Sequence, residues 1–504
     1  MSRGGVLMVQ GTASSAGKSL LVTGLCRLFA RRGVRVAPFK AQNMSNNAAV
    51  VPGGGEIGRA QYVQALAARA LPRVEMNPVL LKPEGNLRSQ VVVLGRPIGT
   101  LHAAAYQEAK ARIWDDVARS LDLLREAFDL VIIEGAGSPA EINLRARDIS
   151  NMRVARYAGA PVLIVGDIDR GGVFAHLYGT YHLLEPEEQA LVRGFVINKL
   201  RGDPSLLEPG LQEIKRLTGV PVVGVVPWIR EPGIAEEDSV ALDRRRDTHG
   251  PFRGVDVAVI RLPRIANFDD FDPLEREPDV RVRYVGQPGQ LGEPDLVIVP
   301  GTKATRDDLA WLRAEGFDAA LERLRAAGVP VIGICGGFQL LGEAIEDPEG
   351  VEGEAGAAEG LGWLRCRTRF GRGKVTRVSR VCLEGGPGLL DGCAGLEVEG
   401  YEIHAGATAI EGEPAAWTVE GEPIGAASDD GLVFGWYVHG AFRDREFRAR
   451  LLGNVARLRG KPFAPGEVED EDAAFERLAD VLESSLDIER VASWALAGAE
   501  RWAG

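Results

Sequence analysis

The sequence predicts an α/β protein built from two doubly wound domains, and three observations lead to this prediction. Short apolar runs rich in Val, Ile and Leu alternate with helical patterns through the first half of the 504-residue chain. The alternation breaks between Trp228 and Gly254, where prolines, glycines and a mixed charge run are typical of a linker. It restarts at Val255. A chain of this length corresponds to about two to four domains.

Apolar runs of the first half are predicted strands of one mostly parallel sheet. Strands buried on both faces of such a sheet are continuously apolar, as these runs are. They are Val6–Gln10, Arg35–Lys40, Gln90–Leu94, Leu130–Glu134, Val162–Gly166, Gly194–Asn198 and Val222–Val226. The helical patterns between them include Lys18–Arg32, Ile57–Ala70, Ala104–Phe128 and Leu206–Leu217.

The second half repeats the alternation and then becomes more β-like. The predicted strands are Val255–Arg261, Val280–Val285, Leu296–Val299, Val331–Ile334, Thr368–Leu383, Leu396–His404 and Val433–Tyr437. A helix is expected near Asp307–Ala326, and the acidic segment Glu346–Gly360 is expected to be a surface loop. We therefore divide the chain into domains 1–235 and 253–450, a linker 236–252 and a helical extension 451–504.

Composition excludes several classes of protein. The net charge of −12 argues against a nucleic-acid-binding face, which is usually basic. No apolar run approaches the roughly 20 residues that span a bilayer. The five cysteines form no CxxC pair, which argues against a disulfide framework and a structural zinc site. A reducing, cytoplasmic location is expected.

The first candidate site is a glycine-rich turn between a strand and a helix, GTASSAGKS at Gly11–Ser19. Backbone N–H groups of such a P-loop bind nucleotide phosphates. Thr12 and Gly17 are expected among the ATP-binding residues. Lys18 is expected to reach the β- and γ-phosphates, and the Ser19 hydroxyl to bind Mg²⁺. Five residues separate Gly11 from Gly17, one more than in the common pattern.

This longer spacing resembles the dethiobiotin synthetase branch of P-loop proteins, which use ATP to activate a carboxylate. The resemblance makes Glu134, in IIEGAGSP, a second Mg²⁺ ligand beside Ser19. It also makes Asn198, in VINKL, a contact to the base. Because Arg201 stands where the guanine-selective pattern has Asp, adenine is favoured. The expected cofactors are ATP and Mg²⁺.

The second candidate site is a tight strand-to-helix turn, GICGGFQ, with Cys335 at its tip. Small neighbours let the backbone fold sharply there, and Gly336 is expected to donate its N–H to an oxyanion. A thiolate needs a base. His439 follows an apolar strand in GWYVHGAF and is the favoured base, while His404 in YEIHAG is the rival.

These residues resemble the class I glutamine amidotransferase fold, in which a cysteine attacks the glutamine amide and a histidine shuttles the proton. That family usually has a carboxylate two residues after the histidine, where this chain has Ala441. Its loss resembles the cobyrinate/cobyrate synthase subgroup and leaves open what orients His439. Glu402 is a candidate.

The whole chain resembles the cobyric acid synthase family. Segments that carry the resemblance include KAQNMSNN, GEIGRAQYVQALAAR, MNPVLLKP, GDIDRGGVFA, VINKLRGD and PGTKATRDDLAWL. The resemblance implies amidation of the b, d, e and g carboxylates of adenosylcobyrinic acid a,c-diamide, with glutamine and ATP used at each of the four steps. Acyl phosphates are the expected intermediates. The expected partners are thus glutamine and a corrinoid.

Polar side chains after two strands fit such a substrate. One group follows the second predicted strand and consists of Lys40, Gln42, Asn43, Asn46 and Asn47. Lysine pairs with phosphate or carboxylate, and asparagine bonds to carboxylates and amides. Asp169 also follows a strand, where it either binds Mg²⁺, helps to activate ammonia or caps the next helix.

Two alternatives remain open. A cobyrinic acid a,c-diamide synthase combines the same two domains but amidates other carboxylates. The segment KAQNMSNN favours the cobyric acid family. A non-catalytic P-loop switch fused to an inactive amidotransferase domain is the second. Retention of Lys18, Ser19, Cys335 and His439 argues against it.

Overall fold

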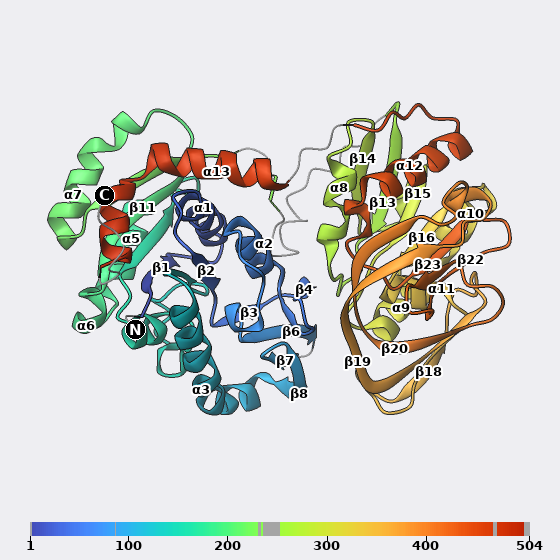
Figure 1. Cartoon of the computed structure of the whole chain (residues 1–504), viewed down its shortest axis with the longest axis horizontal. Coiled ribbons are helices and arrows are strands. Elements are labelled where there is room, and N and C mark those ends of the chain that lie inside the picture. Colours follow the sequence, from blue (N-terminus) through green and yellow to red (C-terminus); the bar gives the residue numbers. More distant parts are fainter. Residues whose placement is uncertain (1–2, 86, 230–232, 235–251, 467–470, 498–504) are drawn as a thin grey trace.

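A computed structural model describes residues 3–85, 87–229, 233–234, 252–466 and 471–497. Two α/β bodies lie side by side, the N-terminal one mostly blue to green and the C-terminal one yellow-green to orange-red (Figure 1). Except for Phe252, the expected linker 236–252 lies outside the described residues, as does its charge run Arg244–Asp247.

The N-terminal body is built on a six-stranded parallel sheet, which confirms the predicted fold class there. Its strand order is β12-β11-β10-β1-β9-β2. The strands are β1 (Gly5–Gly11), β2 (Val36–Phe39), β9 (Leu130–Glu134), β10 (Val162–Asp167), β11 (Val192–Leu200) and β12 (Val222–Pro227). Because the strands are parallel, the P-loop after β1 and Glu134 at the end of β9 lie at the same sheet edge.

The predicted strand Gln90–Leu94 forms but belongs to a separate sheet. That sheet has the order β3 (Gln42–Met44), β6 (Val79–Gly85), β7 (Arg88–Val93) and β8 (Arg96–His102). Short turns between β6, β7 and β8 make them antiparallel, whereas a parallel sheet needs long crossovers. A hairpin of β4 (Ala48–Val50) and β5 (Glu56–Gly58) lies beside it, at the edge that faces the C-terminal body (Figure 1).

Helices cover both faces of the parallel sheet. They are α1 (Lys18–Arg31), α2 (Arg59–Ala67), α3 (Ala103–Ala127), α4 (Met152–Ala158), α5 (Val173–His182), α6 (Pro186–Gln189) and α7 (Glu208–Thr218). The last two helices of the chain, α13 (Glu471–Ser485) and α14 (Ile488–Ala495), return to this body (Figure 1). Leu482 packs in one apolar cluster with Val22, and Arg27 is buried beside Asp472.

The C-terminal body has an eleven-stranded mixed sheet. Its parallel part is β14 (Val280–Val285), β13 (Val255–Ile260), β15 (Leu296–Val299), β16 (Val331–Ile334) and β23 (Val433–Trp436). The remaining strands are β17 (Ala344–Asp347), β18 (Gly356–Glu359), β19 (Cys366–Leu383), β20 (Glu397–Ile410), β21 (Ala416–Thr418) and β22 (Pro423–Ala427). Its helices are α8 (Asp272–Glu275), α9 (Thr305–Ala314), α10 (Phe317–Ala326), α11 (Gly336–Leu341) and α12 (Arg445–Arg459).

Two local expectations for this body are wrong. The helix expected near Asp307–Ala326 is split into α9 and α10, because the chain turns at Gly316, whose φ is +82°. The segment Glu346–Gly360 is not only a loop, since β18 pairs antiparallel with β17. Gly350 and Gly353, both with positive φ, let the chain reverse between the two strands.

Short 3-10 turns complete the fold. They are η1 (Val74–Met76), η2 (Arg145–Arg147), η3 (Pro204–Leu207), η5 (Phe268–Phe271), η6 (Pro288–Gln290), η7 (Gly388–Leu390) and η8 (Ala441–Arg443). Among the described helices, none is both long enough and apolar enough to span a membrane.

Candidate active sites in the two bodies

The turn between β16 and α11 places Cys335 at a sharp strand-to-helix elbow. Its φ of 52° and ψ of −109° are rare for a residue with a side chain. The glycines that follow are required sterically. A Cβ at Gly336 would lie 2.7 Å from Thr302 Cγ2, and one at Gly337 only 1.9 Å from the carbonyl oxygen of Val299. The expected elbow is therefore present, with the sulfur 3.6 Å from the Ile403 carbonyl oxygen.

His439 follows β23 and is fixed on three sides. Its backbone bridges to Tyr401, whose ring stacks on the imidazole at 5.4 Å between centroids. Nδ1 lies 2.7 Å from Asp270 Oδ2, and Cys335, which lines the same cavity, raises the pKa of the ring. The favoured base thus shares a cavity with the thiol. The rival, His404, stacks on Tyr437 instead and lies 2.7 Å through Nδ1 from the Gly406 carbonyl oxygen.

Asp270 is the residue that orients His439, and the sequence analysis missed it. It lies in η5, and its other oxygen accepts a hydrogen bond from the Gly440 N–H at 2.8 Å. Glu402, the earlier candidate, bonds to His404 Nε2 at 3.1 Å, to Arg377 and to Ser379. An available signal was FDDFD at 268–272, where acids alternate with buried aromatic residues.

The electrostatics of this group favour a charged imidazole. Burial lowers the pKa of His439, but the Asp270 carboxylate and Cys335 outweigh burial and raise it to about 10. The imidazole is then protonated across neutral pH. A cationic imidazole beside a thiol favours the thiolate, which is the nucleophilic form of cysteine.

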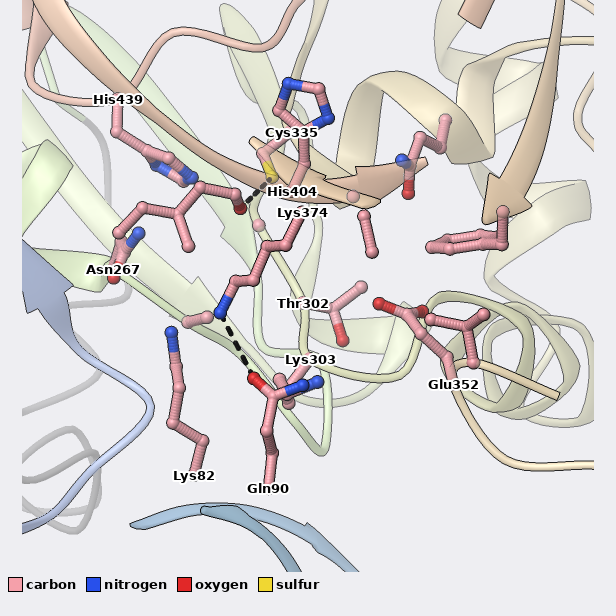
Figure 2. A pocket seen from close by; sticks show the side chains of 18 residues that line it. Lys82, Gln90, Asn267, Thr302, Lys303, Cys335, Glu352, Lys374, His404 and His439 are labelled. Atoms are coloured by element: carbon pink, nitrogen blue, oxygen red, sulfur yellow. Dashed lines mark hydrogen bonds between the residues drawn. The ribbon is translucent and has the colours of Figure 1, made fainter. Parts of the chain in front are cut away.

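A cavity of about 50 Å³ opens beside Cys335, and both bodies line it (Figure 2). Gln339, Lys303 and Glu352 lie along the C-terminal part of its wall. Lys82 and Gln90 close its other end, and they belong to the small sheet of the N-terminal body. The cavity therefore connects the cysteine with the neighbouring body.

A buried charge cluster seals the junction at that end. Glu56 of β5 lies 2.8 Å from Lys82 Nζ and also pairs with Lys374 of β19. Lys374 donates to Gln90 Oε1 at 3.1 Å (Figure 2). Burial raises the pKa of Glu56, but the two ammonium groups outweigh burial and lower it to about 2. Burial lowers the pKa of Lys374 to about 8.

In the N-terminal body, the P-loop connects β1 with α1 as expected. Lys18 Nζ donates to the carbonyl oxygens of Ala13, Ser14 and Gly137 at 3.0–3.3 Å. Asn198 supports the loop, because its amide donates to the Ala16 carbonyl oxygen at 2.9 Å. A Cβ at Gly17 would lie 2.1 Å from that amide nitrogen, so only glycine fits.

Ser19 and Glu134 come together at the sheet edge. Ser19 Oγ donates to Glu134 Oε1 at 2.9 Å, and Lys40 Nζ lies 2.9 Å from the same oxygen. Gln64 of α2 donates to Glu134 Oε2 at 2.6 Å. Magnesium is bound through oxygen ligands, usually one or two from the protein with water and phosphate oxygens. This hydroxyl and carboxylate fit that requirement.

The remaining polar residues after β2 bond mainly within the protein. Gln42 accepts from the Tyr106 hydroxyl at 2.6 Å, and Asn43 donates to Gln61 Oε1 at 2.9 Å. Asn47 Oδ1 accepts from the Phe268 N–H across the junction at 3.4 Å. By contrast, the buried Asn46 Oδ1 has no hydrogen-bond partner within the described part of the chain.

Asp169 does not cap α5, so the expectation that it caps the helix after its strand is wrong. The N-cap of α5 is Gly172, and Asp169 Oδ1 instead accepts from Arg201 Nε at 2.7 Å. The conformation of Gly172, with φ of +68°, lets the chain enter the helix without a capping side chain.

Comparisons with known proteins match the two bodies separately and the chain as a whole. Residues 7–239 match a CobQ/CobB/MinD/ParA nucleotide binding domain, and residues 256–447 match a CobB/CobQ-like glutamine amidotransferase domain. The chain is 54% identical to the cobyric acid synthase of Sorangium cellulosum, covering 95% of this chain and 96% of that protein. It is 46% identical to that of Moorella thermoacetica, covering 99% of each. It is 49% identical to that of Herpetosiphon aurantiacus, covering 96% of each.

Proposed function

Because the chain belongs to the cobyric acid synthase family, we propose that it amidates the b, d, e and g carboxylates of adenosylcobyrinic acid a,c-diamide, with adenosylcobyric acid as product. At the coarser level it is a glutamine-dependent amidating ligase of cobalamin biosynthesis. The observation that supports the chemistry best is the Cys335–His439–Asp270 group, whose cavity ends on the nucleotide-binding body.

The C-terminal body supplies the glutaminase step in this proposal. The Cys335 thiolate attacks the side-chain amide carbon of glutamine, and the Gly336 N–H stabilises the oxyanion. The imidazolium of His439 gives its proton to the leaving ammonia, while Asp270 keeps the ring in place. Water, with His439 as base, then hydrolyses the thioester to glutamate and restores the thiolate.

The N-terminal body activates the substrate carboxylate. Thr12, Gly17 and Lys18 would hold the ATP phosphates, with Asn198 at the base side of the loop. Ser19 and Glu134 would hold Mg²⁺, which neutralises charge on the phosphates when bound. The carboxylate takes the terminal phosphoryl group from ATP to form an acyl phosphate, and ammonia then displaces phosphate to leave an amide.

The residues proposed to contact the corrinoid lie after the carboxyl ends of β2 and β10. Lys40, beside Glu134, is placed to approach both a phosphate and a substrate carboxylate. Asn46 offers a buried acceptor, and Asp169 lies at the carboxyl end of β10, at the ligand edge of the sheet. Gln42, Asn43 and Asn47 would act from the same junction. In this division of labour, 1–235 forms the amide and 253–450 supplies ammonia.

Mass spectrometry of adenosylcobyrinic acid a,c-diamide, incubated with the protein, ATP, Mg²⁺ and glutamine, tests the proposal. We expect four successive amidations and then a stop. No change in this substrate, with two amides gained by cobyrinic acid itself, would identify an a,c-diamide synthase instead. No change in either corrinoid would contradict the proposed substrate class.

A further inference from the structure

Arg59, the first residue of α2, belongs to the nucleotide-binding body but ends inside the other one. Its side chain is 2% exposed, and Nε lies 2.9 Å from Asp269 Oδ2 of η5. Asp269 precedes Asp270, the residue that orients His439. A side chain from the N-terminal body thus reaches the element that holds the catalytic histidine of the C-terminal body.

Two adjacent buried carboxylates need a compensating cation. Burial raises the pKa of Asp269 to about 6, and the charge of Asp270 acts in the same direction, whereas Arg59 opposes both. The other groups that act on Asp269 are His439, which lowers its pKa and is itself bound to Asp270, Arg443, 3.5 Å away, and Glu471. Because Arg443 is a third exposed and also pairs with Glu471, Arg59 is the fully buried partner of Asp269.

The backbone around Arg59 ties the same two elements together. The Arg59 N–H donates to the Asn47 carbonyl oxygen at 3.1 Å. The Asn47 side chain accepts from the Phe268 N–H, and the Ala48 N–H donates to Asn267 Oδ1 at 3.0 Å. The start of α2 and the hairpin beside it are therefore bound to η5 by hydrogen bonds as well as by charge.

We propose that Arg59 is a positioning residue for glutamine hydrolysis, which acts through Asp269 to keep Asp270 on His439. The amidotransferase centre is then complete only when the nucleotide-binding body is docked against it. This proposal rests on the glutaminase role assigned to Cys335 and His439. It does not depend on which corrinoid the protein amidates.

Arg59→Gln tests the proposal in the full chain, with Arg69→Ala as the matched control. Arg69 follows the same helix and pairs with Glu476 within the N-terminal body. Glutamine hydrolysis is measured as glutamate release, and Cys335 reactivity as the pH profile of alkylation by iodoacetamide. We expect kcat for glutamine to fall about 10- to 100-fold at nearly constant KM, because a small displacement of a catalytic group is costly.

Two further readouts separate positioning from folding. Amidation driven by added ammonium salt should stay within about twofold of wild type, because it bypasses His439. The alkylation profile should shift, whereas a structural defect elsewhere would not move it. Adding Asp269→Asn to Arg59→Gln should recover much of the lost glutaminase rate, because the uncompensated charge is removed with its partner.

An unchanged glutaminase rate and alkylation profile would overturn the proposal, as would equal losses in the glutamine- and ammonia-driven reactions. If Arg59→Gln does not fold, Arg59→Lys tests the same point, because it keeps the charge but loses the planar fork, and a smaller loss is expected. Failure of the wild-type protein to amidate the corrinoid would contradict the proposed function alone, since glutamate release and alkylation need no corrinoid.

Discussion

The two candidate sites handle their key cation differently. The ammonium group of Lys18 lies against three neutral carbonyl groups of the P-loop region. The imidazolium of His439 is instead held by a carboxylate, Asp270, in a pocket that leaves it 1% exposed. The contacts named for Lys18 are thus backbone carbonyl oxygens, whereas His439 is held by a side-chain carboxylate.

The difference follows from the chemistry proposed for each site. In the proposed reaction the phosphates of ATP bind, react and dissociate. The contacts of Lys18 with backbone carbonyl oxygens are ones that a phosphate oxygen can replace. In proton transfer the same side chains act through the whole reaction. A geometry that is fixed before the substrate binds therefore lowers the barrier. We therefore expect the carbonyl contacts of Lys18 to be replaced when nucleotide binds, and the His439–Asp270 pair to persist through the reaction.

Loss of the nucleophile gives the largest expected effect. Cys335→Ala should abolish glutamine-driven amidation, because no other thiol lies at the elbow, yet keep the reaction driven by ammonium salt. Both reactions are followed by mass spectrometry of the corrinoid. Cys382→Ala, at a half-buried cysteine of β19, is the control. Loss of both reactions in Cys335→Ala would contradict the separation of roles between the bodies.

Asp270→Asn should lower kcat for glutamine by about 10²- to 10⁴-fold, the usual contribution of general acid–base catalysis. Glu402→Gln is the matched comparison, because Glu402 pairs with the rival histidine, His404. A much smaller loss is expected there. Equal losses would mean that the two histidines share the proton transfer.

Asp270→Asn should also change how the free energy of unfolding depends on pH. Because folding raises the pKa of His439 from 6.5 to about 10, this group stabilises the protein fully below pH 6.5. The contribution is lost as the pH rises through about 10. The unfolding free energies of wild type and Asp270→Asn should therefore converge between pH 7 and 10. A constant difference between the two would contradict the assignment of Asp270.

Lys18→Ala should lower both the glutamine- and the ammonia-driven amidation by about 10²- to 10³-fold, the range for removing one charge-stabilising donor. Glutamate release without corrinoid should fall far less, because Lys18 lies in the other body. Lys215→Ala, at an exposed lysine of α7, is the control. If ammonia-driven amidation survived in Lys18→Ala, the P-loop would not activate the carboxylate.

The smallest effect is expected at the junction. Glu56→Gln leaves Lys82 and Lys374 without their shared carboxylate, so the end of the cavity should open to solvent. We expect about the same glutaminase rate but less amide formed per glutamate released, because ammonia escapes. The ratio of the two products measures this. Glu343→Gln, at a half-buried pair on the surface, is the control.

The sequence predicts best those features that lie within one contiguous segment. The P-loop is one contiguous segment, and the rule for parallel sheets brings Glu134 to Ser19 without further information. Asp270 was missed because it lies 169 residues before His439, and no spacing rule joins them. The small mixed sheet was missed because Gln90–Leu94 is apolar enough for either kind of sheet. Family resemblance, rather than periodicity, is the basis for the proposed substrate.

The return of α13 and α14 to the first body has a consequence for how the protein is made. A ribosome releases the N-terminal body long before it translates Leu482 and the other residues that complete the same apolar core. Domains usually fold as units during synthesis, from the N-terminus onward. Here the core of the body translated first is completed only by α13 and α14, which are translated after the whole second body. A chain truncated before them would leave that partly finished core open to chaperones and proteases.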